Sequence, residues 1–313
     1  MKILVIVITY NGKQWYDRCF NSLRNSNLPV QTIVIDNAST DDTIDYITEN
    51  YPEIHLIASK ENLGFTKANN IGIKYALDKG ADYIFLLNQD AWIENDTLEK
   101  LLNVFKDEPD AGIVSPVHLN GSGSELDLGF AGYIAPNNTP GFISDLYCGK
   151  LKKNYKTEFV NAAAWLISRK CIEKVGGFDA SLFYHYGEDD NYCKRVIYNN
   201  FSIYITTETV IHHDRESRNE KRPEKFEQNR EIVYRYVYYS NPFLDDEIIS
   251  NKILSLKTKY KRKRIKLILL LDFKNLRKFK EYTNRELEFF SSINKSRTEY
   301  KTGEINWLDK NPL

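Results

Sequence analysis

The first 90 residues alternate between short apolar runs and segments with helical periodicity. The run Ile3–Ile8 is apolar at every position, which is typical of a buried central strand. Further apolar strands are expected at residues 32–35, 54–58 and 83–87. Between the strands, apolar side chains recur at helical spacing over residues 13–25 and 67–78. A third helix is expected after Ser39 or Thr40, whose hydroxyls can cap it. Strands that alternate with helices predict a parallel sheet with right-handed crossovers.

The amino-acid composition changes in the middle of the chain. Glycine, serine, asparagine and proline punctuate residues 112–156 around β-like runs at 113–117 and 130–135, which indicates loops or an antiparallel addition. Alternating apolar residues over 159–167 predict another strand, and residues 171–175 a short helix. The expected fold is therefore α/β, with a Rossmann-like, mostly parallel central sheet flanked by helices and a small antiparallel addition.

Polar side chains follow three of the expected strands at the point where each strand ends. Thr9-Tyr10-Asn11 follows the first strand, Asp36-Asn37 ends the second, and Asn88-Gln89-Asp90 follows the fourth. In an open parallel sheet, ligands bind in the crevice beyond the carboxyl ends of the strands. We therefore expect these side chains to line one shared site.

Asp90 is a candidate metal ligand. It follows the apolar residues 84–87, so its carboxylate can hold a hard divalent cation while diphosphate and water complete the coordination. Taken alone, Asp90 fits equally well as an acid near the start of a helix. His212 and His213, adjacent at the end of a strand-like segment, favour the metal interpretation because imidazole also binds Mn²⁺-type ions.

Three consecutive acids, Glu188, Asp189 and Asp190, follow an aromatic segment and Gly187. Adjacent carboxylates repel one another unless cations, hydrogen bonds or raised pKa values relieve them, so such a run either decorates a surface or belongs to an active site. The aromatic residues 183–186 favour partial burial. A carboxylate held beside a sugar hydroxyl can remove its proton as the oxygen attacks.

Composition and charge limit the partners of the chain. Its 313 residues include 43 lysines and arginines and 43 acids, so no net field draws it to nucleic acid. The four cysteines show neither CxxC spacing nor the density of a disulfide scaffold, which indicates free thiols in a reducing, cytoplasmic compartment. No apolar stretch approaches the roughly 20 residues that a membrane-spanning helix needs.

Two stretches beyond residue 213 are strongly charged. Residues 214–230 are expected to form a loop or the start of a solvated helix. Residues 251–280 carry twelve lysines and arginines and one acid, Asp272, interleaved with apolar side chains. This composition is typical of a basic amphipathic helix on an anionic membrane, and equally of a solvated helix whose apolar stripe docks on the rest of the protein.

Together these signatures resemble family-2 inverting glycosyltransferases with the GT-A fold, in particular the rhamnosyltransferase-like branch. The resemblance extends from residue 3 to about residue 240. It rests on the order and spacing of eight segments: 7–11, 34–41, 61–65, 69–72, 86–90, 175–179, 187–189 and 212–213. Any one of these motifs alone is weak evidence.

The resemblance implies a site for a divalent cation, Mn²⁺ or Mg²⁺. Asn88 stands at the first position of the family's acidic metal motif, where other branches often carry aspartate, and Gln89 replaces its common proline. Asp90 is then the only carboxylate of the motif. The second implied ligand is His212, with His213 as a close rival.

The resemblance also implies roles for the other matching residues. The nucleotide-sugar pocket would be lined by Thr9, Tyr10, Asn11, Asp36, Asn37, Asn62, Gly64, Asn70 and Asn88. Asp189 would be the catalytic base. Glu188 would support the base. Independently of the resemblance, Trp165 is a candidate for stacking on the acceptor sugar, although core packing is the commoner role of such a ring.

Organisation and activity follow from the same resemblance. Residues 1–240 would form the catalytic domain, with a nucleotide-binding half of about 1–110 and an acceptor half of about 111–240, before a basic, helical extension over 241–313. The reaction would move a sugar, with inversion, from a nucleoside-diphosphate sugar to a hydroxyl of a cell-surface glycan or a lipid-linked acceptor. The first expected donor is dTDP-rhamnose and the next a UDP-hexose. The enzyme would be cytoplasmic, with residues 251–280 touching the inner face of the membrane.

Other classes fit less well. A non-catalytic nucleotide-sugar-binding relative of the same fold would require broken catalytic positions, whereas Asp90, Asp189 and His212 are all present. A Rossmann dehydrogenase is excluded because no GxGxxG follows the first strand. A nucleotidylyltransferase would need a Gly- and Arg-rich phosphate loop there, and Thr9-Tyr10-Asn11-Gly12 is no such loop.

Overall fold

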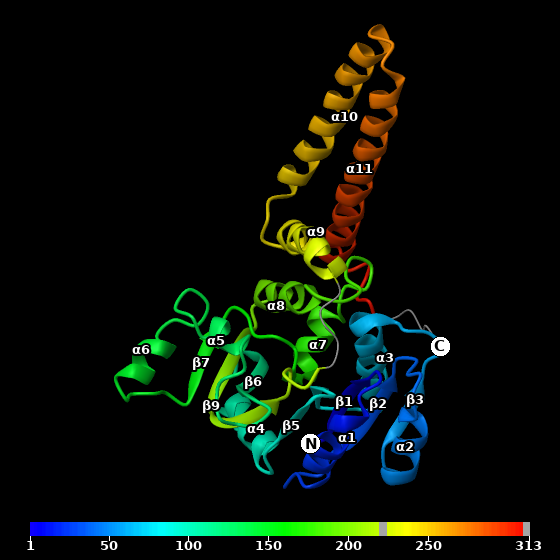
Figure 1. Ribbon diagram of the computed structural model, residues 1–313. Coiled ribbons are helices and arrows are strands. Elements are labelled where there is room, and N and C mark those ends of the chain that lie inside the picture. The colour runs from blue at the N-terminus through cyan, green and yellow to red at the C-terminus, as the bar shows by residue number, and fades with distance from the viewer. Residues whose placement is uncertain (219–223, 309–313) are drawn as a thin grey trace.

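The computed structural model describes residues 1–218 and 224–308, in which the central element is a nine-stranded mixed sheet (Figure 1). The strand order is β3-β2-β1-β4-β8-β6-β9-β5, with β7 paired to β9. The first four strands are β1 (Ile3–Thr9), β2 (Gln31–Asp36), β3 (His55–Ala58) and β4 (Tyr83–Asn88), and they pair in parallel. The parallel half of the sheet predicted from the sequence is therefore confirmed, and its carboxyl ends share one edge.

Helices cover both faces of this parallel half. They are α1 (Lys13–Arg24), α2 (Thr43–Asn50), α3 (Gly64–Asp78) and α4 (Thr97–Asp107). Alternate residues of β1 face opposite layers, because side chains on a strand point to opposite sides of the sheet. Leu4 and Ile6 pack in the layer that contains α3, whereas Val5 and Val7 pack in the layer of α1 and α4. The strand is thus buried on both faces, as its unbroken apolar run predicts.

The helix α2 begins later than the sequence suggests. Ser39 and Thr40 do not cap it, and residue Asp42 precedes its first turn. The Ser39 hydroxyl instead accepts the Asn11 amide at 3.0 Å, and the Thr40 amide donates to the Asn11 side-chain oxygen at 2.9 Å. The two polar residues therefore join the loop after β2 to the loop after β1.

The second half of the sheet is more mixed than expected. Its strands are β5 (Ala91–Ile93), β6 (Ala111–Asn120), β7 (Asn154–Thr157), β8 (Ala164–Ser168) and β9 (Ser202–His213). β8 runs antiparallel between β4 and β6, whereas β6 and β9 are parallel. The antiparallel element is therefore inserted into the middle of the sheet rather than added at its edge. The helices of this half are α6 (Phe142–Tyr147), α7 (Arg169–Val175) and α8 (Glu188–Tyr198).

Residues 130–135, predicted as a β-like run, begin with the short helix α5 (Phe130–Tyr133) instead. The carboxylate of Asp127 accepts the amides of Gly129 and Phe130 at 2.9 and 3.0 Å, which starts a helical turn. The Phe130 side chain is fully buried. A local side chain to backbone contact thus overrides the β-like composition.

The C-terminal region forms a long helical hairpin that stands away from the sheet (Figure 1). α9 (Glu224–Ser240) packs at its base, and α10 (Asp246–Leu269) and α11 (Phe273–Lys301) run antiparallel. The predicted helical extension is confirmed, but the basic stretch 251–280 is divided between two helices. Within the described ranges, none of the helices has the length and apolarity to span a membrane. Residues 219–223 of the charged stretch and 309–313 lie outside the described residues.

After the hairpin, the chain returns to the α/β part of the molecule. The Asn306 carbonyl accepts the Gly177 amide at 2.7 Å, and the Trp307 carbonyl accepts the Asn70 side-chain amide at 3.3 Å. The Trp307 ring centroid lies 4.5 Å from the guanidinium of Arg195, which is only 2% exposed. The last described residues therefore close a buried part of the core around Arg195.

We expect Trp307→Ala to lower the free energy of unfolding by about 3 kcal/mol, because the substitution opens a cavity beside a buried guanidinium. Urea titration followed by circular dichroism measures this change. Trp307→Phe keeps a ring over Arg195 and should lose much less. An unchanged urea midpoint in Trp307→Ala would show that residues 306–308 do not contribute to the stability of the core.

Candidate active site at the strand ends

The ends of β1 and β2 are joined by a buried polar contact. Asp36, the last residue of β2, is fully buried and accepts a hydrogen bond from the Thr9 hydroxyl at 3.0 Å. It also accepts the Ser39 amide at 3.0 Å. The three residues fix the two loops that follow these strands, so the predicted residues Thr9, Asn11 and Asp36 do lie together.

A second group of predicted residues connects β2 to the loop before α3. Asn37 donates from its side chain to Asn62 at 2.9 Å and accepts the Leu63 amide at 2.6 Å. Gly64 adopts a φ of +73°, and a Cβ there would lie 2.5 Å from the Tyr184 carbonyl oxygen. Glycine is required at this position because the backbone is left-handed and approaches a neighbour closely.

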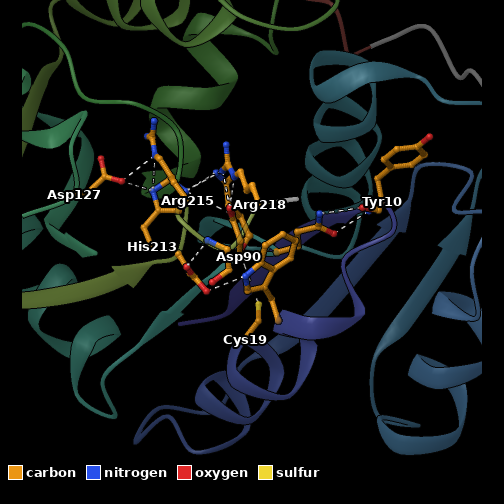
Figure 2. A network of polar contacts seen from close by, with 12 residues as sticks. Tyr10, Cys19, Asp90, Asp127, His213, Arg215 and Arg218 are labelled. Atoms are coloured by element: carbon orange, nitrogen blue, oxygen red, sulfur yellow. Dashed lines mark hydrogen bonds and ion pairs between the residues drawn. The ribbon is translucent and has the colours of Figure 1, made fainter. Parts of the chain in front are cut away.

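Gln89 holds the loops after β1 and β4 together. Its side-chain oxygen accepts the Tyr10 amide at 2.8 Å, and its side-chain nitrogen donates to the Tyr10 carbonyl at 3.1 Å. The Tyr10 ring is 38% exposed and points away from the polar cluster in Figure 2. The residue that departs from the family motif therefore has a structural task that proline could not perform.

Asp90 lies at the centre of a charged cluster with His213, Asp127, Arg215 and Arg218 (Figure 2). Its carboxylate is 3% exposed and accepts a hydrogen bond from the Arg218 Nε at 2.6 Å. His213 lies between two carboxylates, with Nε2 3.5 Å from Asp90 and Nδ1 3.3 Å from Asp127. The Arg215 Nε lies 2.8 Å from Asp127. The cluster thus joins the end of β4 to the end of β9.

The neighbouring histidine and arginine side chains keep both carboxylates charged. Burial alone would raise the pKa of Asp90, but His213 and Arg218 together hold this pKa below its ordinary value. Burial acts on Asp127 in the same way, and His213 and Arg215 lower its pKa to about 2. Both groups are therefore negative at neutral pH, in a position suited to hold positive charge.

The two adjacent histidines occupy different environments. His213 faces Asp90, whereas His212 points to the other side of β9, where Nε2 lies 3.1 Å from a Glu94 oxygen. The His212 ring also stacks on Trp92 with centroids 5.4 Å apart. Consecutive side chains on a strand point to opposite faces, so only one of the pair can reach the cluster. The structure brings His213 to Asp90, in the place that the sequence assigned first to His212.

Sequence reasoning missed Asp127, Arg215 and Arg218. Asp127 lies within residues 112–156, where the composition indicates only loops or an antiparallel addition. The two arginines lie in the charged stretch 214–230, which predicts only a loop or the start of a helix. The sequence did indicate that a cation lies near Asp90, because a carboxylate at the end of a buried strand requires one. The first candidates for that cation are the arginines that follow the histidine pair.

The acidic residues at the start of α8 are strongly perturbed. Burial, followed by repulsion from Asp189, raises the pKa of Glu188. Burial also raises the pKa of Asp189 above its ordinary 3.8. Within the described residues, the Glu188 Oε2 has no hydrogen-bond partner, which favours its protonated form. The third acid, Asp190, pairs with Lys194 at 2.5 Å.

Tyr133 connects this acidic pair to the Asp90 cluster. Burial, followed by the charge of Asp189, raises the pKa of Tyr133 to about 12, while Arg215 and its hydrogen bond lower it. Asp127 acts on the same hydroxyl. A single phenol thus lies within the electrostatic reach of both groups of acids, so the two groups border one region of the protein.

Two predicted site residues lie elsewhere. The Asn70 side chain donates to the Phe178 carbonyl at 2.8 Å and accepts the Phe178 amide at 2.7 Å, so it ties α3 to the segment after α7. Trp165 is fully buried in β8 and stacks on Phe178 with centroids 6.2 Å apart. A ring without exposed surface cannot stack on an acceptor sugar in this conformation.

The cluster at Asp90 offers few ligands for a metal ion. Across residues 1–218 and 224–308, no group of three or more histidine, cysteine and acidic side chains is arranged to hold one. The chemistry of Asp90 and His213 still fits Mn²⁺ or Mg²⁺, since both accept carboxylate oxygen and Mn²⁺ also accepts imidazole. Arg218 contacts both candidate ligands, at 2.6 Å from an Asp90 oxygen and 3.3 Å from the His213 Nε2, so these residues would hold a metal only after Arg218 moved and a diphosphate supplied further oxygens.

Comparisons with known proteins identify the family of the chain. The family model described as Glycosyl transferase family 2 matches residues 4–176. The dTDP-rhamnosyl transferase RfbF of Shigella flexneri is 27% identical over 212 residues, covering 67% of this chain and 68% of that protein. The N-acetylglucosaminyl-diphospho-decaprenol L-rhamnosyltransferase of Mycobacterium tuberculosis is 26% identical over 238 residues, covering 67% of this chain and 75% of that protein. The predicted resemblance is confirmed.

A solved structure supports the fold. The mannosyltransferase PcManGT of Pyrobaculum calidifontis, in complex with GDP-Man and Mn²⁺, superposes with a TM-score of 0.53 at 15% sequence identity. The superposition covers 97% of this chain and 88% of that chain. The GT-A fold predicted from the sequence is confirmed by this likeness.

Proposed function

Because the chain belongs to glycosyl transferase family 2, we propose that it moves a sugar, with inversion, from a nucleoside-diphosphate sugar to an acceptor hydroxyl. The observation that carries the proposal is the juxtaposition of two charged groups at the carboxyl edge of the sheet. One is the Asp90–His213 pair, and the other is the acidic pair Glu188–Asp189, with Tyr133 linking them. A sugar transferase needs both groups, because the nucleoside diphosphate leaves as an anion and the acceptor hydroxyl loses a proton.

Asp189 is the proposed general base. Its carboxylate would take the proton of the acceptor hydroxyl while that oxygen attacks the anomeric carbon and the bond to the diphosphate oxygen breaks on the opposite face. Burial raises the pKa of Asp189, and a base with a pKa nearer to neutral takes a proton more readily. Glu188, protonated by the same burial, would avoid a second negative charge beside the base.

The Asp90 cluster is proposed to receive the departing diphosphate. Arg215 and Arg218 supply positive charge there, and Asp127 and Arg215, each 3.3 Å from the Nδ1 of His213, fix the orientation of its ring. A divalent cation, Mn²⁺ or Mg²⁺, is proposed to bind Asp90 and His213 and would offset the charge that develops on the leaving group. The nucleoside would lie along Asp36, Asn37 and Asn62.

The likeness to RfbF favours dTDP-rhamnose as the donor, followed by a UDP-hexose. The acceptor is proposed to be a hydroxyl of a cell-surface glycan or of a lipid-linked sugar, since the mycobacterial relative is named for a decaprenol-linked one. This reaction would take place in the cytoplasm at the inner face of the membrane.

Calorimetry with UDP, dTDP and GDP, each with and without Mn²⁺, tests the proposal on the full chain. We expect dTDP to bind most tightly and Mn²⁺ to strengthen its binding, and dTDP-rhamnose with an acceptor to release dTDP. Binding without any release from a panel of nucleotide sugars and acceptors would favour the non-catalytic alternative. A folded protein that binds none of the three nucleotides would contradict the proposal.

A further inference from the structure

The turn of the α10–α11 hairpin exposes a concentrated group of large apolar side chains. This apolar tip consists of Ile265, Ile268, Leu269, Leu270, Leu271 and Phe273. Their exposed fractions range from 40% for Ile268 to 78% for Leu269. The turn lies at the end of the hairpin farthest from the sheet (Figure 1). Single exposed apolar residues are ordinary, but a contiguous group at a projecting turn indicates an interaction site.

The backbone of the turn does not favour these residues. Leu271 adopts a φ of 54°, in the left-handed region where glycine and asparagine are accommodated at lower cost. A leucine at this position therefore adds apolar surface to the turn while making the turn harder to form. The exposed side chain, rather than the turn, is what the leucine contributes.

Positive charge surrounds the apolar tip. The basic collar consists of Lys261, Arg262, Lys263, Arg264, Lys266, Lys274, Arg277 and Lys278, all exposed. Asp272, the one acid between 251 and 280, is engaged within the turn and accepts the Asn275 amide at 3.1 Å. An apolar point within a ring of cations is complementary to a lipid surface with anionic head groups.

We propose that the apolar tip inserts into the interface of an anionic bilayer while the basic collar binds the lipid head groups. A second copy of the chain is a poorer partner, because its collar would bring like charges together. The exposed apolar residues gather at the tip rather than in a stripe along α10, where, of the described residues outside the tip, Ile248 (38% exposed) and Leu254 (63%) are the large apolar side chains that are exposed. The hairpin would therefore contact the membrane by its end and not along its length.

Sedimentation with vesicles tests the proposal on the full chain. We expect binding to vesicles of phosphatidylcholine mixed with phosphatidylglycerol and little binding to phosphatidylcholine alone. Leu269→Ser/Leu270→Ser/Leu271→Ser should weaken binding by at least about tenfold through lost apolar contact. Arg262→Gln/Lys263→Gln/Arg264→Gln should weaken it on the order of a hundredfold, at roughly fivefold for each charge. The matched control Leu254→Ser removes an equally exposed leucine outside the tip and should bind like the wild type.

Two further measurements keep the outcomes distinct. Leu271→Gly removes one apolar side chain but eases the left-handed backbone, so weaker binding by this variant cannot be attributed to a misfolded turn. Nucleotide binding by every variant should remain unchanged, which separates this proposal from the proposed function. Equal binding to neutral and anionic vesicles would overturn the proposal, and so would full binding by the triple-serine variant. The proposal would also be overturned if the wild type bound no vesicles but formed a dimer that the triple-serine variant no longer formed.

Discussion

Asp189→Asn is expected to reduce sugar transfer by about 10² to 10⁴-fold while donor binding stays close to that of the wild type. Asparagine keeps the size of the side chain and its contact with the Asp190 amide, but its amide cannot take a proton from the acceptor. The loss should appear in kcat, because the base acts during the chemical step. Single-turnover kinetics with saturating donor, together with calorimetry of donor binding, separates the two effects.

The neighbouring acid supplies the matched control. Asp190 forms an i,i+4 pair with Lys194, so Asp190→Asn should lose little stability and retain most activity. The wild-type kcat/KM should fall as the pH is lowered through the raised pKa of Asp189, because protonation of the carboxylate removes the base. Full activity in Asp189→Asn would falsify the assignment of the base, and inactivity of Asp190→Asn alone would move it to the neighbouring residue.

Asp90→Asn is expected to weaken metal-dependent binding of the nucleoside diphosphate by about a hundredfold or more, since outer-shell changes alone typically cost 10 to 100-fold. The substitution removes the one carboxylate that the strand end presents and leaves Arg218, now 2.6 Å from Asp90, without a negatively charged partner there. Calorimetry at several Mn²⁺ concentrations measures the effect. Binding in the absence of metal should change much less.

The adjacent histidines provide an internal comparison for this site. His213→Gln should weaken the metal-dependent part of nucleotide binding, because His213 faces Asp90. His212→Gln alters a side chain on the opposite face, beside Glu94 and Trp92, and should leave binding nearly unchanged. The reverse order of effects would mean that β9 changes register when the donor binds.

The sequence was sufficient to predict the parallel half of the fold. Four apolar runs separated by helical periodicity leave few other topologies, and polar residues after those runs must meet at the carboxyl edge of the sheet. For this reason Thr9, Asp36 and Asn37 were assigned to one site without knowledge of the structure. The position of β8 could not be predicted, because nothing in a strand's own sequence states which strands will pair with it.

The choice between His212 and His213 also depended on long-range pairing. Alternation along β9 alone does not predict which histidine faces Asp90, because the register of its pairing with β6 shifts. Pro116 pairs with Thr206, but the next residue, Val117, pairs with Val210. An irregularity of this kind changes which residues face the cluster. Asn70 illustrates the same limit, since its side chain contacts residue 307, which no local pattern relates to it.

The return of residues 306–308 to the core determines the order in which parts of the protein can fold during translation. The strands that end at or just before Thr9, Asp36 and Asp90 leave the ribosome early. The contacts of Asn70 and Gly177 with residues 306 and 307 can form only after those two residues have been synthesised. A nascent chain can therefore assemble its sheet long before it can close the space around Arg195. The last step of folding therefore waits for residues 306 and 307, and a chain terminated before them carries an open core that quality-control proteases can recognise.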